Sequence, residues 1–229
     1  MNASTSVPPF ETFPALGSAT PWARHAFVQR VPKVVVDVER AEAMERLQSA
    51  HLAAAEALGF SGDALWTAEQ VHGREVALVP DPSIDGQLIA GADGLITRTP
   101  GCLLGIYVAD CGPIYVADIQ SRAIAVLHSG RVGTELNILA NCVERMKREF
   151  STRVADLVVQ LGPCIRPPAY EVDFAAQILG QARELAIPEE QIFDCGSCTA
   201  QGLDKYYSYR LEKGKTGRML ALFGIPAGK

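Results

Sequence analysis

Apolar and polar residues follow two different periods along this chain. Alternating positions predict two short strands around the tetrapeptide QVHG within residues 64–80, and a run of strands separated by turns over 92–130. Further strands are expected at 33–38, 156–165 and 217–225. Apolar residues that recur every three to four positions predict helices over 39–60, 134–150, 173–186 and 202–214, with Thr134 and Asp173 as N-caps.

These elements predict an α+β fold, because the strands outnumber the helices and partly follow one another directly. The chain contains no internal repeat and no clear linker, so residues 22–229 are expected to form a single domain. Residues 1–21 are rich in Pro, Ser, Thr and Ala and are expected to form a loosely ordered lead-in.

Composition narrows the range of functions. The chain has 229 residues, 48% of them hydrophobic and 21% charged, as in ordinary globular proteins. A net charge of −5 without a basic stripe argues against a nucleic-acid partner. No run approaches the roughly 20 apolar residues of a membrane span, and the N-terminus lacks a secretory pattern. Six cysteines in such a chain predict free thiols or metal ligands in a reducing cytoplasm.

Three residues that can bind metal stand where predicted strands end beside glycine. They are His72 in QVHG, Cys111 in ADCG and His128 in LHSG. Two imidazoles and a thiolate suit Zn²⁺ and leave a fourth position for water or substrate. The separations of 39 and 17 residues are not a local zinc-binding spacing. Two alternatives to a metal site therefore remain. Cys111 could be a buried apolar residue, or it could be a metal-free nucleophile with His128 or His72 as its base.

The remaining candidates are weaker. His51 lies on the apolar stripe of a predicted helix and is expected to be structural, and His25 could pack or cap. Cys195 and Cys198 form a C-x-x-C without the context of a redox motif. The arginines placed to bind phosphate are Arg30, Arg131 and Arg210, because each lies beside turn or aromatic residues.

Several motifs in order resemble one family. They are EQVHG (69–73), ADGLIT (92–97), VADCGPI (108–114), LHSG followed by GT (127–134), LGPCI and AYEV (161–172), and YYSYR and TGR (206–218). This succession resembles the YfiH-like, laccase-domain family, which carries the name polyphenol oxidase and is associated with zinc-dependent purine nucleoside phosphorolysis. The resemblance extends from about residue 25 to the C-terminus.

The resemblance implies a four-layer α/β/β/α sandwich and a zinc site formed by His72, Cys111 and His128. It implies phosphorolysis of adenosine, inosine, guanosine and methylthioadenosine, with some deamination of adenosine, by a monomer or homodimer. Gln70, with Arg30, Arg131 and Arg210, would then bind nucleoside or phosphate. Copper is the less favoured metal: a multicopper oxidase needs about ten histidines and the chain has four, although a single blue-copper centre is still open.

Two departures from the family pattern concern phosphate. Where the family reads His-Ala-Gly-Trp-Arg-Gly, this chain has His128-Ser129-Gly130-Arg131-Val132-Gly133. Arg131 could replace the missing arginine from the neighbouring position. The N-terminal pattern of an arginine followed by two glycines is reduced to Arg30 in FVQRVPK. A non-catalytic protein that keeps the metal is therefore a further alternative.

Overall fold

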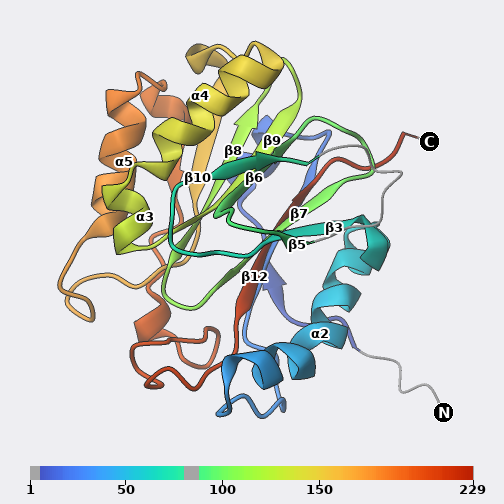
Figure 1. The fold of residues 1–229 in the computed structure, drawn as a ribbon, viewed down its shortest axis with the longest axis vertical. Coiled ribbons are helices and arrows are strands. Elements are labelled where there is room, and N and C mark those ends of the chain that lie inside the picture. The colour runs from blue at the N-terminus through green and yellow to red at the C-terminus, as the bar shows by residue number, and fades with distance from the viewer. Residues whose placement is uncertain (1–5, 80–87, 229) are drawn as a thin grey trace.

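The computed structural model describes residues 6–79 and 88–228, which form two mixed sheets with helices on their outer faces (Figure 1). In the first sheet the strand order is β1-β2-β12-β7-β3-β5. Its strands are β1 (Phe10–Glu11), β2 (Arg24–Val28), β3 (Leu65–Ala68), β5 (Leu88–Ile89), β7 (Leu103–Val108) and β12 (Met219–Gly224).

The second sheet has the order β11-β10-β8-β9-β6-β4. Its strands are β4 (Val76–Leu78), β6 (Gly94–Thr97), β8 (Gly112–Asp118), β9 (Ala123–Ser129), β10 (Leu157–Leu161) and β11 (Ile192–Asp194). Both sheets combine parallel and antiparallel pairs, for example β3 with β7 (parallel) and β8 with β9 (antiparallel). The predicted α+β class with mixed sheets is confirmed.

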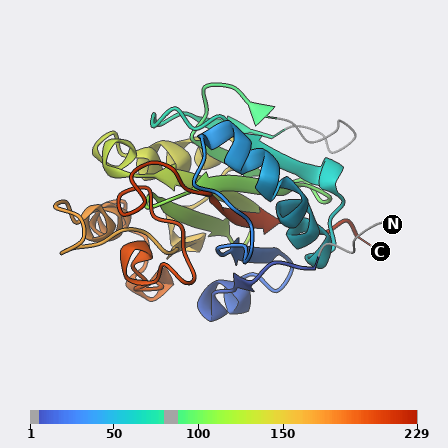
Figure 2. The same ribbon diagram turned by 90° about the horizontal axis from the view of Figure 1, so that it is seen from below.

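Helices cover the outer face of each sheet. The α-helices are α1 (Pro14–Ala19), α2 (Arg40–Ala57), α3 (Arg131–Glu135), α4 (Ile138–Phe150) and α5 (Phe174–Glu184). Short 3-10 helices are η1 (Gly62–Ala64), η2 (Val154–Asp156), η3 (Glu189–Gln191) and η4 (Thr199–Gln201). Helices α4 and α5 lie on the opposite side of the paired sheets from α2 (Figures 1 and 2).

Strand alternation explains the layers, since successive side chains point to opposite faces. In β12, Met219, Ala221 and Phe223 belong to the core between the sheets, whereas Leu220 and Leu222 pack with apolar residues of α2. Strands β8 and β9 likewise divide their side chains between this central core and a second core under α4 and α5. The arrangement is the expected four-layer α/β/β/α sandwich.

Three predicted elements differ in the structure. Residues 33–38 form no strand; Val34, Val36 and Val38 face the central core and the residues between them are exposed, so the alternation reflects a loop that packs along the core. Residues 202–214 form turns, because Asp110 accepts hydrogen bonds from the Ser208 hydroxyl (3.0 Å) and the Arg210 backbone N–H (2.7 Å). The helix expected over 134–150 is two helices, since Asn137 has a left-handed φ of 55° and caps α4. Asp173 caps α5, as predicted.

The expected lead-in needs correction. Residues 1–5 lie outside the described residues. Further along, β1 pairs with β2, and Phe13 and Leu16 are buried in the central core, so these positions are part of the fold. Within the described residues, no helix is both long and apolar enough to cross a membrane.

Candidate metal centre and its cavity

Strand pairing brings the three predicted metal-binding residues together. His72 follows β3 and Cys111 follows β7, and these strands are parallel neighbours, so they end at the same edge of the first sheet. His128 belongs to β9, whose register with β8 places Ser129 opposite Gly112, the residue after Cys111. The site therefore forms where an edge of one sheet meets the β8–β9 hairpin of the other.

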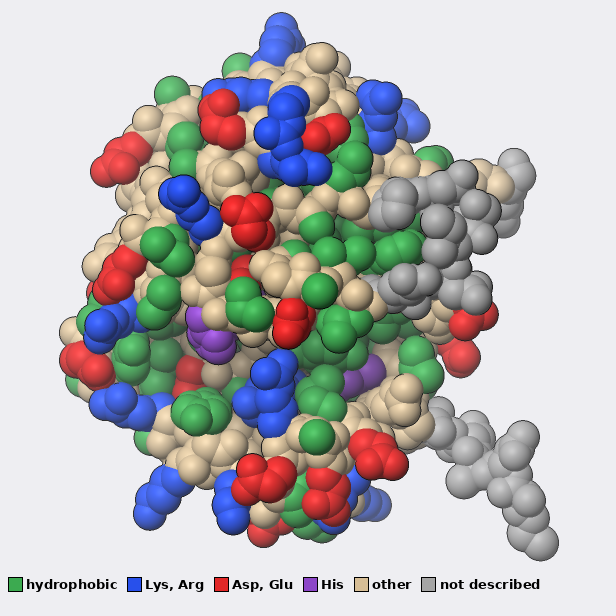
Figure 3. Space-filling model, viewed as in Figure 1, with side chains coloured by type: hydrophobic (Ala, Val, Ile, Leu, Met, Phe, Trp, Pro, Cys, Tyr) green, Lys and Arg blue, Asp and Glu red, His purple; other side chains and the backbone are tan. Residues whose placement is uncertain are grey.

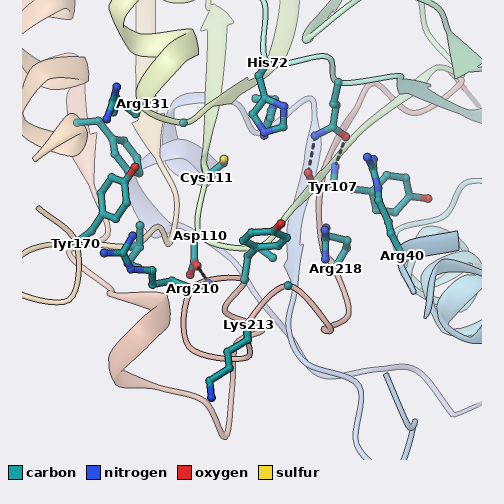
Figure 4. Close-up of a pocket in the computed structure, with 18 of the residues that line it drawn as sticks. Arg40, His72, Tyr107, Asp110, Cys111, Arg131, Tyr170, Arg210, Lys213 and Arg218 are labelled. Atoms are coloured by element: carbon teal, nitrogen blue, oxygen red, sulfur yellow. Dashed lines mark hydrogen bonds between the residues drawn. The ribbon is translucent and has the colours of Figure 1, made fainter. Parts of the chain in front are cut away.

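One nitrogen of each histidine and the Cys111 sulfur lie within 4.8 Å of one another. The two imidazole rings are 4.8 Å apart between centroids and approach edge to face. His72 is exposed, Cys111 is partly buried and His128 is 4% exposed. In Figure 4 the His72 ring is directed into the cavity above Cys111. The cluster is thus open to solvent on the His72 side.

Asp93 positions two of these residues at once. The carboxylate is fully buried and accepts a hydrogen bond from Nδ1 of His128 at 2.8 Å. It also accepts the backbone N–H groups of Val71 (3.1 Å), His72 (2.9 Å) and Gly73 (2.7 Å). Burial alone would raise the pKa of Asp93, but these hydrogen bonds outweigh burial and lower it. An ionised Asp93 requires the proton on Nδ1, which leaves Nε2 of His128 available to a metal.

Gln70 fixes the same loop from the other side. Its side-chain amide donates to the carbonyl of Tyr107 and accepts from the Tyr107 backbone N–H (2.9 Å), so it pairs with β7 as a further strand residue would. Gln70 and His72 both have positive φ, 64° and 61°. Non-glycine residues hold this conformation only where surrounding contacts impose it. The loop that carries His72 is therefore fixed by Gln70 and Asp93.

Asp110 supports the Cys111 turn. It has a positive φ of 81° and accepts hydrogen bonds from Thr199 (2.7 Å), Ser208 and the Arg210 backbone. Adjacent residues of a strand point to opposite faces, so Asp110 is expected to face away from Cys111, and its hydrogen bonds to neighbouring loops confirm this. Gly130 is required on the other side of Cys111, because a Cβ there would lie 2.6 Å from the sulfur.

The charge states of Cys111 and His128 depend on each other. Burial alone would raise the pKa of the Cys111 thiol, but His128 and His72 outweigh it and lower the pKa to about 6. Burial likewise opposes the charge on His128, yet Cys111 and Asp93 raise its pKa to about 9. Without metal the pair is therefore a thiolate and an imidazolium near neutral pH. Metal binding would displace the Nε2 proton.

A cavity of about 790 Å³ opens over the three residues. Figure 3 views this face, where histidine and basic side chains are visible among apolar ones. Tyr170 and Phe174 line one wall. The arginines that line the cavity are Arg40, Arg131, Arg210 and Arg218. The volume suffices for a ligand of nucleoside size together with a small anion.

The model of the family described as "multi-copper polyphenol oxidoreductase laccase" matches residues 36–178 and 172–226. The chain belongs to this laccase family. It is 34% identical over 197 residues to a purine nucleoside phosphorylase of Deinococcus radiodurans, covering 75% of this chain and 74% of the relative. It is 29% identical over 206 residues to purine nucleoside phosphorylase YlmD of Geobacillus stearothermophilus, covering 74% and 75%.

Two solved structures share the fold of this laccase-family protein. Hypothetical protein YfiH of Bacillus licheniformis superposes with a TM-score of 0.81 at 20% identity, covering 90% of this chain and 94% of the other. YlmD of Geobacillus stearothermophilus superposes with a TM-score of 0.79 at 23% identity, covering 91% of this chain and 93% of the other. At these identities the likeness is evidence for the fold alone.

The donor set of this laccase-family chain fits one metal ion better than a copper cluster. Two imidazoles and a thiolate match a catalytic zinc site with an open position. The other two histidines of the chain lie elsewhere: His25 accepts the backbone N–H of Phe13 (2.8 Å), and His51 is buried against Tyr107. The described part of the chain therefore offers no histidines for additional copper ions at this site.

The predicted substrate residues fall into two groups. Gln70, Arg131 and Arg210 line the cavity. The expectation that Arg30 binds phosphate needs correction: Arg30 lies outside the lining, forms an ion pair with Glu212 (2.8 Å) and donates to the Tyr206 carbonyl. Its guanidinium also stacks on Tyr207, so Arg30 holds the C-terminal loop to β2.

Three residues of the site were not predicted from the sequence: Asp93, Arg40 and Arg218. Asp93 and Arg218 were within reach, since they belong to the ADGLIT and TGR motifs. Arg40 begins a helix whose charged residues resemble any solvated face, so nothing in the sequence marked it. Cys195 and Cys198 lie outside the cavity, as expected for a C-x-x-C without a role at the site.

Proposed function

We propose that this protein is a zinc-dependent purine nucleoside phosphorylase, with the metal held by His72, Cys111 and His128. The observation that carries the proposal is this cluster at the base of a nucleoside-sized cavity. The names of relatives at 29% and 34% identity support the reaction. The expected substrates are adenosine, inosine, guanosine and methylthioadenosine, with inorganic phosphate as the second substrate.

Phosphorolysis breaks the bond between C1′ of ribose and the purine nitrogen, and forms a bond from C1′ to a phosphate oxygen. The electron pair of the broken bond leaves with the base, which gains a proton, and ribose 1-phosphate is the other product. Zinc in this site would supply a Lewis acid. Asp93 fixes the tautomer of His128, Gln70 fixes the His72 loop, and the cavity walls bind and orient the two substrates.

The test is base release from inosine by the metal-loaded protein, with and without phosphate. Release that requires phosphate, zinc and His72 supports the proposal. His72→Ala is a suitable variant because the side chain is exposed and its loss should leave the fold intact. Stoichiometric zinc with no base release from any of the four nucleosides would contradict it. Ammonia release from adenosine would measure hydrolytic deamination, which we expect as a side reaction.

One observation favours a second function, that of a metal-free cysteine hydrolase. Cys111, His128 and Asp93 are arranged in series, and a thiolate beside an imidazolium oriented by a carboxylate is the arrangement of nucleophilic cysteine enzymes. A third donor, His72, within 4.8 Å favours the metal. Activity that persists in a strong chelator and is lost on alkylation of Cys111 would favour the hydrolase.

A mononuclear copper oxidoreductase uses a similar ligand set. A protein that stays colourless after copper loading would exclude a blue-copper centre. We include a cytoplasmic location in the proposal, because the sequence predicts thiols or metal ligands rather than a disulfide framework.

A further inference from the structure

The four arginines that line the cavity differ in whether their charge is already neutralised. Arg131 forms an ion pair with Glu135 (3.1 Å) on the same short helix. Arg210 forms one with Glu171 (3.0 Å) and stacks on Tyr170. Among the described residues, neither Arg40 nor Arg218 has a carboxylate within ion-pair distance. Among the arginines of the cavity, those whose charge no described carboxylate neutralises are therefore Arg40 and Arg218.

These two arginines come from elements far apart in the sequence. Arg40 is the first residue of α2, and Arg218 immediately precedes β12. Figure 4 shows both on one side of Cys111, whereas Arg131, Tyr170 and Arg210 lie on the other side and Lys213 is directed away. The cavity thus has one wall with unpaired guanidinium groups and an opposite wall where the arginine charges are paired and Tyr170 lies.

Arg218 is held in place and keeps donors to spare. Its Nη1 donates to the carbonyls of Thr216 (3.1 Å) and Gly217 (3.0 Å), and its guanidinium lies over the ring of Tyr209. Nε and Nη2 accordingly remain for a ligand, since a guanidinium has five N–H donors. Burial first, and then the positive charge of Arg40, lower the pKa of Arg218. An anion between the two guanidiniums would relieve this repulsion. Glu39, the carboxylate of this wall, pairs with neither of them.

We propose that Arg40 and Arg218 form the phosphate subsite, so that the phosphate group binds on the α2 side of the metal centre and the purine on the Tyr170–Phe174 side. The orientation rests on the proposed function. The subsite itself requires only a tetrahedral dianion, which two guanidiniums bind through charge-assisted hydrogen bonds. Inorganic phosphate or the phosphate of a nucleoside 5′-monophosphate would satisfy this chemistry.

The test combines kinetics with direct binding, using the zinc-loaded full chain. We expect Arg40→Gln and Arg218→Gln to raise KM for phosphate about tenfold or more, as for loss of a charge-assisted hydrogen bond, with little change in KM for inosine. Arg131→Gln should change KM for phosphate by less than about threefold, because its charge is already paired. Arg46→Gln, on the same helix but outside the cavity, is the matched control.

Calorimetric titration with inorganic phosphate, and separately with adenosine 5′-monophosphate, distinguishes this proposal from the proposed function. Binding that is lost in both variants while no nucleoside is cleaved would keep the subsite and reject the phosphorylase. Loss of monophosphate binding alone would assign the subsite to a phosphate ester. Arg40 is exposed, so Arg40→Gln should fold normally. If this variant left both KM for phosphate and phosphate binding unchanged, the proposal would be overturned. The same holds if Arg131→Gln raised KM for phosphate more than Arg40→Gln or Arg218→Gln did.

Discussion

Asp93 accepts a hydrogen bond from His128 Nδ1 at 2.8 Å across a separation of 35 residues, and the same carboxylate accepts the backbone N–H of His72. Two of the three candidate metal-binding residues are therefore positioned by one buried acid. This pairing fixes which nitrogen of His128 faces the cavity and how the His72 loop turns. A carboxylate behind a ligand histidine commonly tunes both metal affinity and orientation.

Asp93→Asn should lower zinc affinity about 10- to 100-fold, since the neutral amide no longer stabilises the Nδ1–H tautomer or accepts three backbone N–H groups equally well. Competition with a chelating dye measures this change. Asp118→Asn is the matched control: Asp118 is also buried and accepts backbone N–H groups, from Gln120 and Ser121, but at the far end of β8. Asp118→Asn should lower the stability of the fold and leave zinc affinity unchanged. Equal losses of zinc affinity in Asp93→Asn and Asp118→Asn would contradict the role of Asp93.

Gly130→Ala should weaken metal binding at least tenfold with a smaller effect on folding. The added Cβ would lie 2.6 Å from the Cys111 sulfur, so the thiolate must move, and metal–ligand distances tolerate only about 0.2 Å. Gly180→Ala in α5 is the control, since nothing lies within 4 Å of its Cβ position. That substitution should stabilise the protein by about 0.5–1 kcal/mol, as for a glycine in a helix interior. Unchanged zinc affinity in Gly130→Ala would contradict the close-packing argument.

The clustering of His72, Cys111 and His128 was predictable from the sequence because each was expected to end a strand beside a glycine, and strand pairing brings such ends together. The supporting residues were harder to identify. Gln70 was predicted to bind substrate, but both ends of its amide bind the Tyr107 backbone, a contact between residues 37 positions apart. Arg30 was predicted to bind phosphate, but Glu212 and Tyr207 take its guanidinium. Local sequence cannot show which carboxylate reaches which arginine.

The helix predicted over 202–214 does not form, again because of a contact with a residue distant in the sequence. Its apolar spacing resembles a helix, but Asp110 accepts the backbone N–H of Arg210 and the hydroxyl of Ser208. A buried acid from 98 residues away thus replaces part of the hydrogen bonding that a helix would supply. By contrast, α2 and α5 follow their predicted ranges closely because each covers a sheet with one apolar face.

Cys111 should be the first thiol to react with iodoacetamide in the metal-free protein at pH 7. Its pKa is lowered to about 6, so the thiolate dominates at pH 7, whereas burial raises the pKa of Cys195 to about 11 and that of Cys142 and Cys164 still further. The rate should fall about tenfold per pH unit below 6, and zinc should protect the thiol. Mass spectrometry of the labelled peptides locates the site. A fast phase that survives in Cys111→Ser would contradict the assignment.

His51 should make the fold sensitive to mild acid. It is 1% exposed, lies beside the Tyr107 ring (5.4 Å between centroids), and burial lowers its pKa to about 4. The unfolded chain protonates this histidine near pH 6.5 while the folded chain does not, so stability is complete above pH 6.5 and declines as pH falls towards 4. The shift corresponds to about 3 kcal/mol of unfolding free energy across that window. Denaturant unfolding at several pH values should show this slope in the wild type and a smaller one in His51→Leu.

His25 contributes a separate share of the acid sensitivity, since burial also lowers its pKa to about 4, so His51→Leu should retain part of that sensitivity. Parallel curves of stability against pH for the wild type and His51→Leu would contradict the assignment.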